Sequence, residues 1–190
     1  MGSKILIING HPDPRPERLC AAIAAAYATG ARAAGHSIKR IDVGAIDFPL
    51  IGSAEDFSET TPPKTVRDGQ AALLWANHVL IVHPLWLGGM PARLKGFLEQ
   101  VLRYGVALSP PGRGMKGLLR GRSVRVIVTM GMPAPVFRWL FGAHGLRALE
   151  MGVLGICGFR PIRHTIVGSA DEGDMTPRLV AIEALGVRAR

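Results

Sequence analysis

The chain has 190 residues, of which 48% are hydrophobic and 19% are charged, and this composition supports one compact domain spanning 1–190. No stretch approaches the roughly 18 uninterrupted apolar residues of a membrane-spanning helix, and no export signal is visible, so we expect a cytoplasmic protein. The net charge of +9 would suit nucleic acid, but no DNA- or RNA-binding motif accompanies it, and we expect no nucleic-acid partner. Cys20 and Cys157 lack the spacing of a metal site or a disulfide scaffold, and we expect neither.

The first third of the chain predicts a strand, a helix and a second strand. Residues 4–9 form a short apolar, β-branched run that ends at a turn, which is typical of a strand buried on both faces. Residues 18–34 are rich in alanine, and Gly35 is placed to end a helix there. Residues 37–42 predict a second strand, and 43–63 predict an irregular surface excursion.

The middle of the chain repeats this alternation. Residues 66–76 predict a helix, and the apolar run 78–83, which ends at Pro84, predicts a third strand. Pro91 opens a further helix. The apolar residues of that helix have the spacing of one buried face, and they are Leu94, Phe97, Leu98, Val101 and Leu102.

The last part of the chain completes the pattern. A connection rich in Gly and Pro, 105–121, precedes a fourth predicted strand at 123–129. Residues 137–157 predict a long helical region, 162–167 a fifth strand, and 176–187 a final helix.

Short apolar strands that alternate with helices indicate an α/β fold, a doubly wound five-stranded parallel sheet covered on both faces. In such sheets ligands bind beyond the carboxyl ends of the strands, where the strand order reverses. We therefore expect the loops after the first, third and fourth strands to carry the function.

The loop after the first strand runs over residues 9–18 and can receive a phosphate. Its backbone N–H groups and the start of the next helix favour an anion, and His11, Arg15 and Arg18 would add donors. The loop is neither a Walker loop nor a Gly-x-Gly-x-x-Gly turn, which disfavours a nucleoside triphosphate or a simple dinucleotide site. In the alternative interpretation the prolines stiffen the loop and His11 only caps it.

The loop after the third strand places Trp86 where a solvated turn would ordinarily be polar. Pro84, Leu85, Trp86 and Leu87 can wall a flat isoalloxazine ring, while the backbone N–H groups between them point at its polar edge. The alternative is that Trp86 is an ordinary packing residue.

The loop after the fourth strand contains Thr129, Gly131 and Met132. Backbone donors near Gly131 would suit the electron-rich N1 and O2 side of a reduced flavin. Three loops of matching character at neighbouring strand ends together indicate a flavin site.

These residues resemble the NAD(P)H dehydrogenase (quinone) family, which includes the quinone-reductase-like ancillary subunits of potassium efflux systems. The resemblance covers most of the chain. It is carried by His11-Pro12, His83-Pro84-Leu85-Trp86, Met90-Pro91-Ala92, Leu94-Lys95-Gly96, Thr129-Met130-Gly131 and Cys157-Gly158-Phe159.

The resemblance implies a flavodoxin-like fold and a flavin-dependent NAD(P)H:quinone-type oxidoreductase. Hydride would pass from NAD(P)H to the flavin, and a quinone or similar acceptor would then take two electrons in a ping-pong cycle. It also implies a homodimer. We expect FMN rather than FAD, because the chain leaves little sequence after its fifth strand for an adenosine pocket.

The sequence departs from the family in the residues that would hold the phosphate. Pro16, Glu17 and Arg18 stand where the family has a Ser-Phe-Asn-like segment, so we expect Arg15 or Arg18 to supply the missing donors, with Glu17 repelling an anion unless it is paired.

Two further departures concern the second flavin loop and the proton supply. Met132 replaces the second glycine of that loop, and Phe137 replaces a tyrosine that assists the flavin in some members. His144 is our candidate catalytic residue in its place, although a structural role is equally open.

Several alternatives stay open on sequence alone. A flavin-binding regulatory subunit of a membrane transporter would keep the same fold and cofactor, whereas a one-electron carrier is disfavoured because such carriers are acidic. The basic cluster between Arg113 and Arg125 would favour the extra phosphate of NADPH or form a solvated face. The apolar Trp139, Phe141 and Met151 are expected in the core rather than at an interface.

Overall fold

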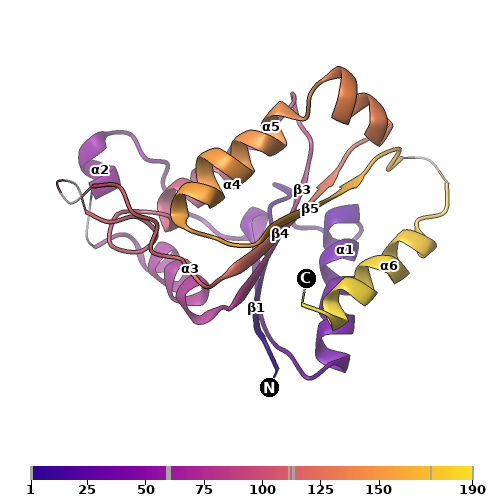
Figure 1. Ribbon diagram of the computed structural model, residues 1–190, viewed down its shortest axis with the longest axis horizontal. Helices are drawn as coiled ribbons and strands as arrows, with labels where there is room; N and C mark the ends of the chain where they lie inside the picture. The colour runs from indigo at the N-terminus through magenta and orange to yellow at the C-terminus, as the bar shows by residue number, and fades with distance from the viewer. Residues whose placement is uncertain (1, 59–60, 111, 113, 172, 190) are drawn as a thin grey trace.

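A five-stranded parallel sheet forms the centre of the protein, in the strand order β2-β1-β3-β4-β5 (Figure 1). The computed structural model describes residues 2–58, 61–110, 112, 114–171 and 173–189. The strands are β1 (Lys4–Asn9), β2 (Ser37–Asp42), β3 (His78–Pro84), β4 (Ser123–Thr129) and β5 (Ile162–Val167). All five predicted strands are present, and the predicted doubly wound α/β fold is confirmed.

Burial explains the apolar runs of the central strands. Every residue of β3 is buried, as is every residue of β1 after Lys4, because helices cover both faces of the sheet there. The strand β2 lies at one edge and is partly exposed, which fits its more polar sequence.

Helices cover the two faces as a doubly wound sheet requires (Figure 1). Helices α1 (Leu19–Ala33) and α6 (Thr176–Val187) pack side by side on one face. The other face carries α3 (Lys64–Trp75) and α4 (Ala92–Val101), together with α5 (His144–Arg147) and its continuation η3 (Ala148–Gly155). Gly35 follows α1 with φ +76°, which confirms it as the predicted helix end.

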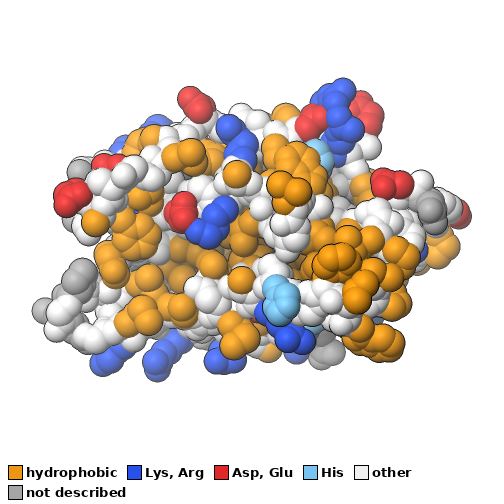
Figure 2. Space-filling view, turned by 90° about the horizontal axis from the view of Figure 1, so that it is seen from above, with side chains coloured by type: hydrophobic (Ala, Val, Ile, Leu, Met, Phe, Trp, Pro, Cys, Tyr) orange, Lys and Arg blue, Asp and Glu red, His pale blue; other side chains and the backbone are white. Residues whose placement is uncertain are grey.

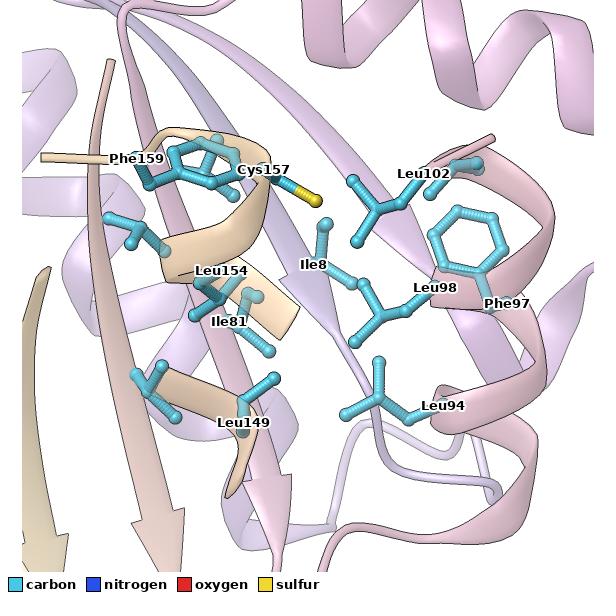
Figure 3. Close-up of a cluster of buried hydrophobic side chains, with 14 of the residues drawn as sticks. Ile8, Ile81, Leu94, Phe97, Leu98, Leu102, Leu149, Leu154, Cys157 and Phe159 are labelled. Atoms are coloured by element: carbon cyan, nitrogen blue, oxygen red, sulfur yellow. The ribbon is translucent and has the colours of Figure 1, made fainter. Parts of the chain in front are cut away.

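The core under α4 confirms the predicted apolar face of that helix (Figure 3). Its side chains point toward the sheet and toward the segment that leads into β5. The residues that meet there are Ile8, Ile81, Leu94, Phe97, Leu98, Leu102, Leu149, Leu154, Cys157 and Phe159.

The predicted irregular excursion at 43–63 contains two short helical turns. They are η1 (Val43–Ala45) and α2 (Ala54–Ser58), and residues 59 and 60 lie outside the described part of the chain. Asp56 accepts a hydrogen bond from the backbone of Gly52 at 2.9 Å, so a local side-chain contact supports α2.

The long helix predicted at 137–157 is interrupted. It is divided into η2 (Val136–Leu140) and the continuous pair α5 and η3. Gly142 and Ala143 between them have φ values of +61° and +50°, a left-handed conformation that ends a right-handed helix.

The expectation that Trp139, Phe141 and Met151 lie in the core was wrong. Their exposed fractions are 81%, 53% and 73%. In η2 only Phe137 is buried in the core. In η3 the buried residues are Leu149 and Leu154. Figure 2 shows broad apolar areas on this side of the molecule.

Within the residues that the structure describes, we find no helix with both the length and the apolar character needed to cross a bilayer.

Candidate functional site

A pocket of about 330 Å³ lies beyond the carboxyl ends of the strands. The loops after β1, β3, β4 and β5 all contribute to it, as the strand order predicts. It is lined by His11, Glu17, Arg18, Leu19, Cys20, Pro84, Leu85, Trp86, Thr129, Met130, Gly131, Ala170 and Asp171.

A tight turn presents Trp86 to this pocket. Trp86 and Gly89 exchange two backbone hydrogen bonds of 2.9 and 3.0 Å, and the two residues between them, Leu87 and Gly88, have φ values of +47° and +80°. Positive φ at both central positions is typical of a two-residue primed hairpin turn. Trp86 is half exposed and meets the edge of the His11 ring at a centroid distance of 5.9 Å.

The same turn points Leu87 into solvent. Its side chain is fully exposed at the tip and does not line the pocket, although the sequence suggests it as a wall residue. The wall facing the pocket consists of Pro84, Leu85 and Trp86.

The base of this loop is fixed by two contacts. The backbone N–H of Leu85 donates to the carbonyl of Thr129 at 2.8 Å, which ties the loop to β4. The ring Nδ1 of His83 donates to the carbonyl of Pro84 at 2.9 Å. Burial lowers the pKa of His83 to about 4, so this ring is neutral at neutral pH.

His11 lies in the first loop, as predicted, but it is not a source of positive charge. Its Nδ1 lies 3.0 Å from both the backbone nitrogen and the carbonyl oxygen of Asp13, and burial lowers its pKa. The loop is tied to β3 because Gly10 N–H donates to the carbonyl of Val82 at 2.7 Å. His11 therefore contributes a ring of lowered pKa beside Trp86.

Asp13 binds both arginines that the sequence suggests for phosphate. Arg15 Nη2 and Arg18 Nη2 lie 2.7 and 2.5 Å from Asp13 Oδ2. The Arg15 hydrogen bond, above all, holds the pKa of Asp13 well below its usual range. Only Arg18 lines the pocket, whereas Arg15 lies outside the lining.

The N-terminus of α1 opens onto the same pocket. Its N-cap residue, Arg18, makes no side-chain capping hydrogen bond. The N–H of Ala21 already donates to the Arg18 carbonyl at 2.8 Å, so the N–H groups of Leu19 and Cys20 are the ones open to an anion. Cys20 lies 3.5 Å from the hydroxyl of Thr129, which places the first turn of α1 over the end of β4. Burial raises the pKa of Cys20 to about 11, so its thiol is protonated and unsuited to nucleophilic chemistry.

The loops after β4 and β5 are joined by backbone hydrogen bonds. Met130 N–H donates to Val167 at 3.0 Å, Ala170 N–H to Met130 at 3.0 Å, and Ser169 N–H to Met132 at 3.1 Å. Thr129 and Gly131 reach the pocket, while Met132 is half buried behind it.

His144 is exposed and does not line the pocket, so its suggested catalytic role stays a prediction. Its neighbour Gly145 lies directly behind the Trp86 turn, since a β-carbon there would be 2.0 Å from the carbonyl oxygen of Gly88. Phe137, at the suggested tyrosine position, is buried.

Among the described residues, no member of the basic cluster lines this pocket. Arg122 donates to the carbonyls of Leu74 and Ala76, and the buried Arg125 donates to the hydroxyl of Thr165. Arg113 lies outside the described residues. Arg122 and Arg125 thus make contacts within the fold.

Six lining residues were not among the suggested contacts: Glu17, Leu19, Cys20, Met130, Ala170 and Asp171. The last two follow β5, the neighbour of β4 in the sheet. The rule that ligands bind beyond the carboxyl ends of parallel strands applies to β5 as well, and this is the signal in the sequence that points to these two residues.

A family model described as flavodoxin-like fold matches residues 3–186, nearly the whole chain. The chain belongs to this family. The match confirms the flavodoxin-like fold that the resemblance implies.

The curated relatives include a ribosyldihydronicotinamide dehydrogenase-like protein, traD, from Penicillium crustosum, which is 30% identical over 67% of this chain and 57% of its own length. An uncharacterized NAD(P)H oxidoreductase from Haemophilus influenzae is 27% identical over 64% of this chain and 60% of its own. The ribosyldihydronicotinamide dehydrogenase [quinone] of Pongo abelii is 26% identical over 84% of this chain and 78% of its own length. The matches thus span about three fifths of the first two relatives.

Solved structures agree on the fold. An NAD(P)H:quinone oxidoreductase from Methanothermobacter marburgensis superimposes with a TM-score of 0.84 at 21% identity and covers 100% of both chains. An FMN-dependent NADH-azoreductase from Bacillus anthracis, in complex with FMN, gives a TM-score of 0.74 at 19% identity over 98% of this chain and 97% of the other.

Proposed function

We propose that this protein is a flavin-dependent reductase that transfers two electrons from NAD(P)H to a quinone-like acceptor. The observation that carries the proposal is one pocket that joins a half-exposed Trp86, on a rigid turn, with the uncapped N-terminus of α1. Trp86 suits a flat aromatic ring, and the N-terminus of α1 suits a phosphate. The names of the quinone-reductase relatives support the same reaction.

The residues present fit FMN. Leu85 and Trp86 offer an apolar wall, and Gly131 offers a backbone N–H at the end of β4. Arg18 and the first N–H groups of α1 would hold the phosphate. The absence of a β-carbon at Gly131 leaves room for the carboxylate of Asp171, since a β-carbon there would lie 2.5 Å from its Oδ2.

The flavin, when bound, supplies the hydride chemistry, and the protein supplies position and electrostatics. The turn holds Trp86 in place through its two internal hydrogen bonds, and His83 fixes the Pro84 carbonyl at the base of the loop. The Cys20 thiol, whose pKa is raised by burial to about 11, supplies no thiolate nucleophile to the pocket at neutral pH.

We further propose that two copies of the chain associate, as the resemblance implies. The support is the exposed apolar surface on and near η2, which includes Trp139, Leu140 and Phe141. Exposed apolar patches of this kind commonly mark interaction sites.

The purified protein is expected to carry, or to take up on reconstitution, a yellow flavin that NAD(P)H bleaches and a simple quinone reoxidises. Visible absorption spectra and released-flavin analysis check this directly. Failure to bind any flavin after reconstitution would overturn the proposal. Retained flavin without turnover would instead favour the alternative of a regulatory subunit for a membrane transporter.

Arg18→Ala is expected to weaken FMN binding by about tenfold, because a charge-assisted hydrogen bond contributes roughly 1.5 kcal/mol. Arg15→Ala is the matched control, since it removes the same charge from outside the pocket lining. Fluorescence titration of the apo-protein gives both affinities. Riboflavin, which lacks the phosphate, should bind both variants as it binds the wild type; an equal loss for riboflavin would assign Arg18 a purely structural role.

A further inference from the structure

The N-terminal ends of the strands form a second edge of the sheet, opposite the pocket at their carboxyl ends. Because all five strands are parallel, the segments that lead into them meet at this edge. Hydrogen bonds join these segments. Asn77 N–H donates to the Lys4 carbonyl at 2.8 Å, and Arg160 N–H donates to the Arg122 carbonyl at 2.9 Å. The guanidinium of Arg122 also donates to the carbonyl of Leu74, in the last turn of α3, at 2.9 Å.

The segments at this edge carry positive charge only. They contain nine lysine or arginine residues and no aspartate or glutamate, and they are residues 2–5, 32–39, 74–78, 114–124, 157–163 and 184–189. The exposed members include Lys4, Lys39, Lys116, Arg120, Arg160 and Arg188. Within the part of the chain that the structure describes, none of these six forms a salt bridge. The positive charge of this edge therefore stays uncompensated by its own segments.

The basic cluster of residues 113–125 supplies part of this edge. Leu119 N–H donates to the carbonyl of Cys157 at 2.9 Å. A β-carbon on Gly158 would lie 3.2 Å from Cγ of Arg120. The described part of the cluster thus packs against the turn that leads into β5, which adds its own arginines to the same edge.

Exposed aliphatic side chains accompany these charges. They belong to the same segments and are those of Leu74, Met115, Leu118 and Val187. The Val187 carbonyl lies 3.1 Å from Nε2 of His36, which ties the end of α6 to the segment before β2. A nucleic-acid backbone offers aliphatic side chains no partner, whereas a bilayer buries them at the boundary between headgroups and acyl chains. Charge and apolar character together thus favour a lipid surface over a nucleic acid.

We propose that this basic edge docks the protein on a bilayer that contains anionic lipids. The negative potential of such a surface attracts each nearby lysine or arginine, and the aliphatic side chains add apolar contact with the headgroup region. Five parallel strands at a spacing of about 4.8 Å make the edge about 20 Å wide, so it meets several headgroups at once. The pocket at the opposite end of the strands then faces the aqueous side. Docking and reduction therefore use opposite ends of the molecule.

Co-sedimentation of the full chain with lipid vesicles tests the proposal. The protein is expected to bind vesicles of phosphatidylcholine mixed with phosphatidylserine but not vesicles of phosphatidylcholine alone, and added NaCl should weaken the binding by screening. The double variant Arg120→Gln, Arg160→Gln should bind about 25-fold more weakly, at about fivefold for each charge, with its flavin affinity unchanged. Met115→Ser should also bind more weakly, because it removes an apolar side chain from the contact.

The double variant Arg138→Gln, Arg147→Gln is the matched control. It removes the same charge from exposed residues of η2 and α5, which follow the carboxyl end of β4, and its vesicle binding should equal that of the wild type. A wild type that does not bind the anionic vesicles at low salt, or an equal loss in both double variants, would overturn the proposal.

A short RNA duplex at the same salt concentration tests the other class of polyanion. Tighter binding of the duplex than of the anionic vesicles, unaffected by Met115→Ser, would also overturn the proposal by assigning the edge to nucleic acid. None of these outcomes bears on the flavin function, which flavin titration of the same samples measures separately.

Discussion

Replacing Gly145 with alanine is expected to weaken flavin binding about thirtyfold while the protein stays folded. The added β-carbon would lie 2.0 Å from the carbonyl oxygen of Gly88 and 2.8 Å from the Cα of Gly89. Both are backbone atoms, so the Trp86 turn must move away from α5. Overpacking of this kind costs about 2 kcal/mol. Because flavin binding requires the turn in its original position, the bound state carries this cost, which corresponds to about thirtyfold in affinity.

Gly152→Ala is the matched control for this variant. Gly152 lies in η3, and a β-carbon there would meet no described atom within 4 Å. Alanine is favoured over glycine in a helix by about 0.5–1 kcal/mol, so this variant should be slightly more stable and bind flavin as the wild type does. Flavin titration and chemical denaturation measure the two quantities. Unchanged flavin affinity in Gly145→Ala would show that the Trp86 turn takes no part in the site.

The sheet could be predicted from sequence because its signal is local. Runs such as 78–83 and 123–129 are short, apolar and β-branched, and each lies in a strand buried on both faces. The rule for strand ends points to the edge of the sheet where the pocket lies, and His11, Trp86 and Thr129 are among its lining residues.

Other features depend on backbone conformation or on distant neighbours. The side chain of Leu87 faces solvent because the turn demands positive φ there, and a leucine gives little indication of that conformation. The helix breaks at Ala143, where φ is positive, although the apolar residues around it have a helical pattern. The exposure of Trp139 depends on this break and therefore could not be predicted from the pattern. Asp171 reaches the pocket only through the pairing of two loops that are far apart in sequence.

The unfolding free energy is expected to fall by about 4 kcal/mol between about pH 7 and about pH 5, owing to two buried histidines. Burial lowers the pKa of His83 to about 4. Burial, with the nearby Arg125, also lowers the pKa of His78 to about 4. In the unfolded chain both histidines titrate near about 6.5. Below that pH the unfolded state binds more protons than the folded state, and protonation therefore favours unfolding.

The sign and the window follow from these pKa values. Above about pH 6.5 both rings are neutral in both states and contribute no slope. Between about pH 6.5 and about pH 4 each histidine lowers the stability by about 1.4 kcal/mol per pH unit, and below that range its contribution levels off. Urea denaturation across this range measures the slope.

His78→Asn separates the two contributions. Its amide retains a polar group near Ser123, whose hydroxyl lies 2.7 Å from Nδ1 of His78, but it does not titrate. The variant should therefore lose about half of the pH dependence, leaving the part due to His83, which supports the loop that carries Trp86. If the wild type is equally stable at about pH 7 and about pH 5, both rings accept protons in the folded state and the prediction is wrong. The contact between His83 and the Pro84 carbonyl would then not depend on a neutral ring.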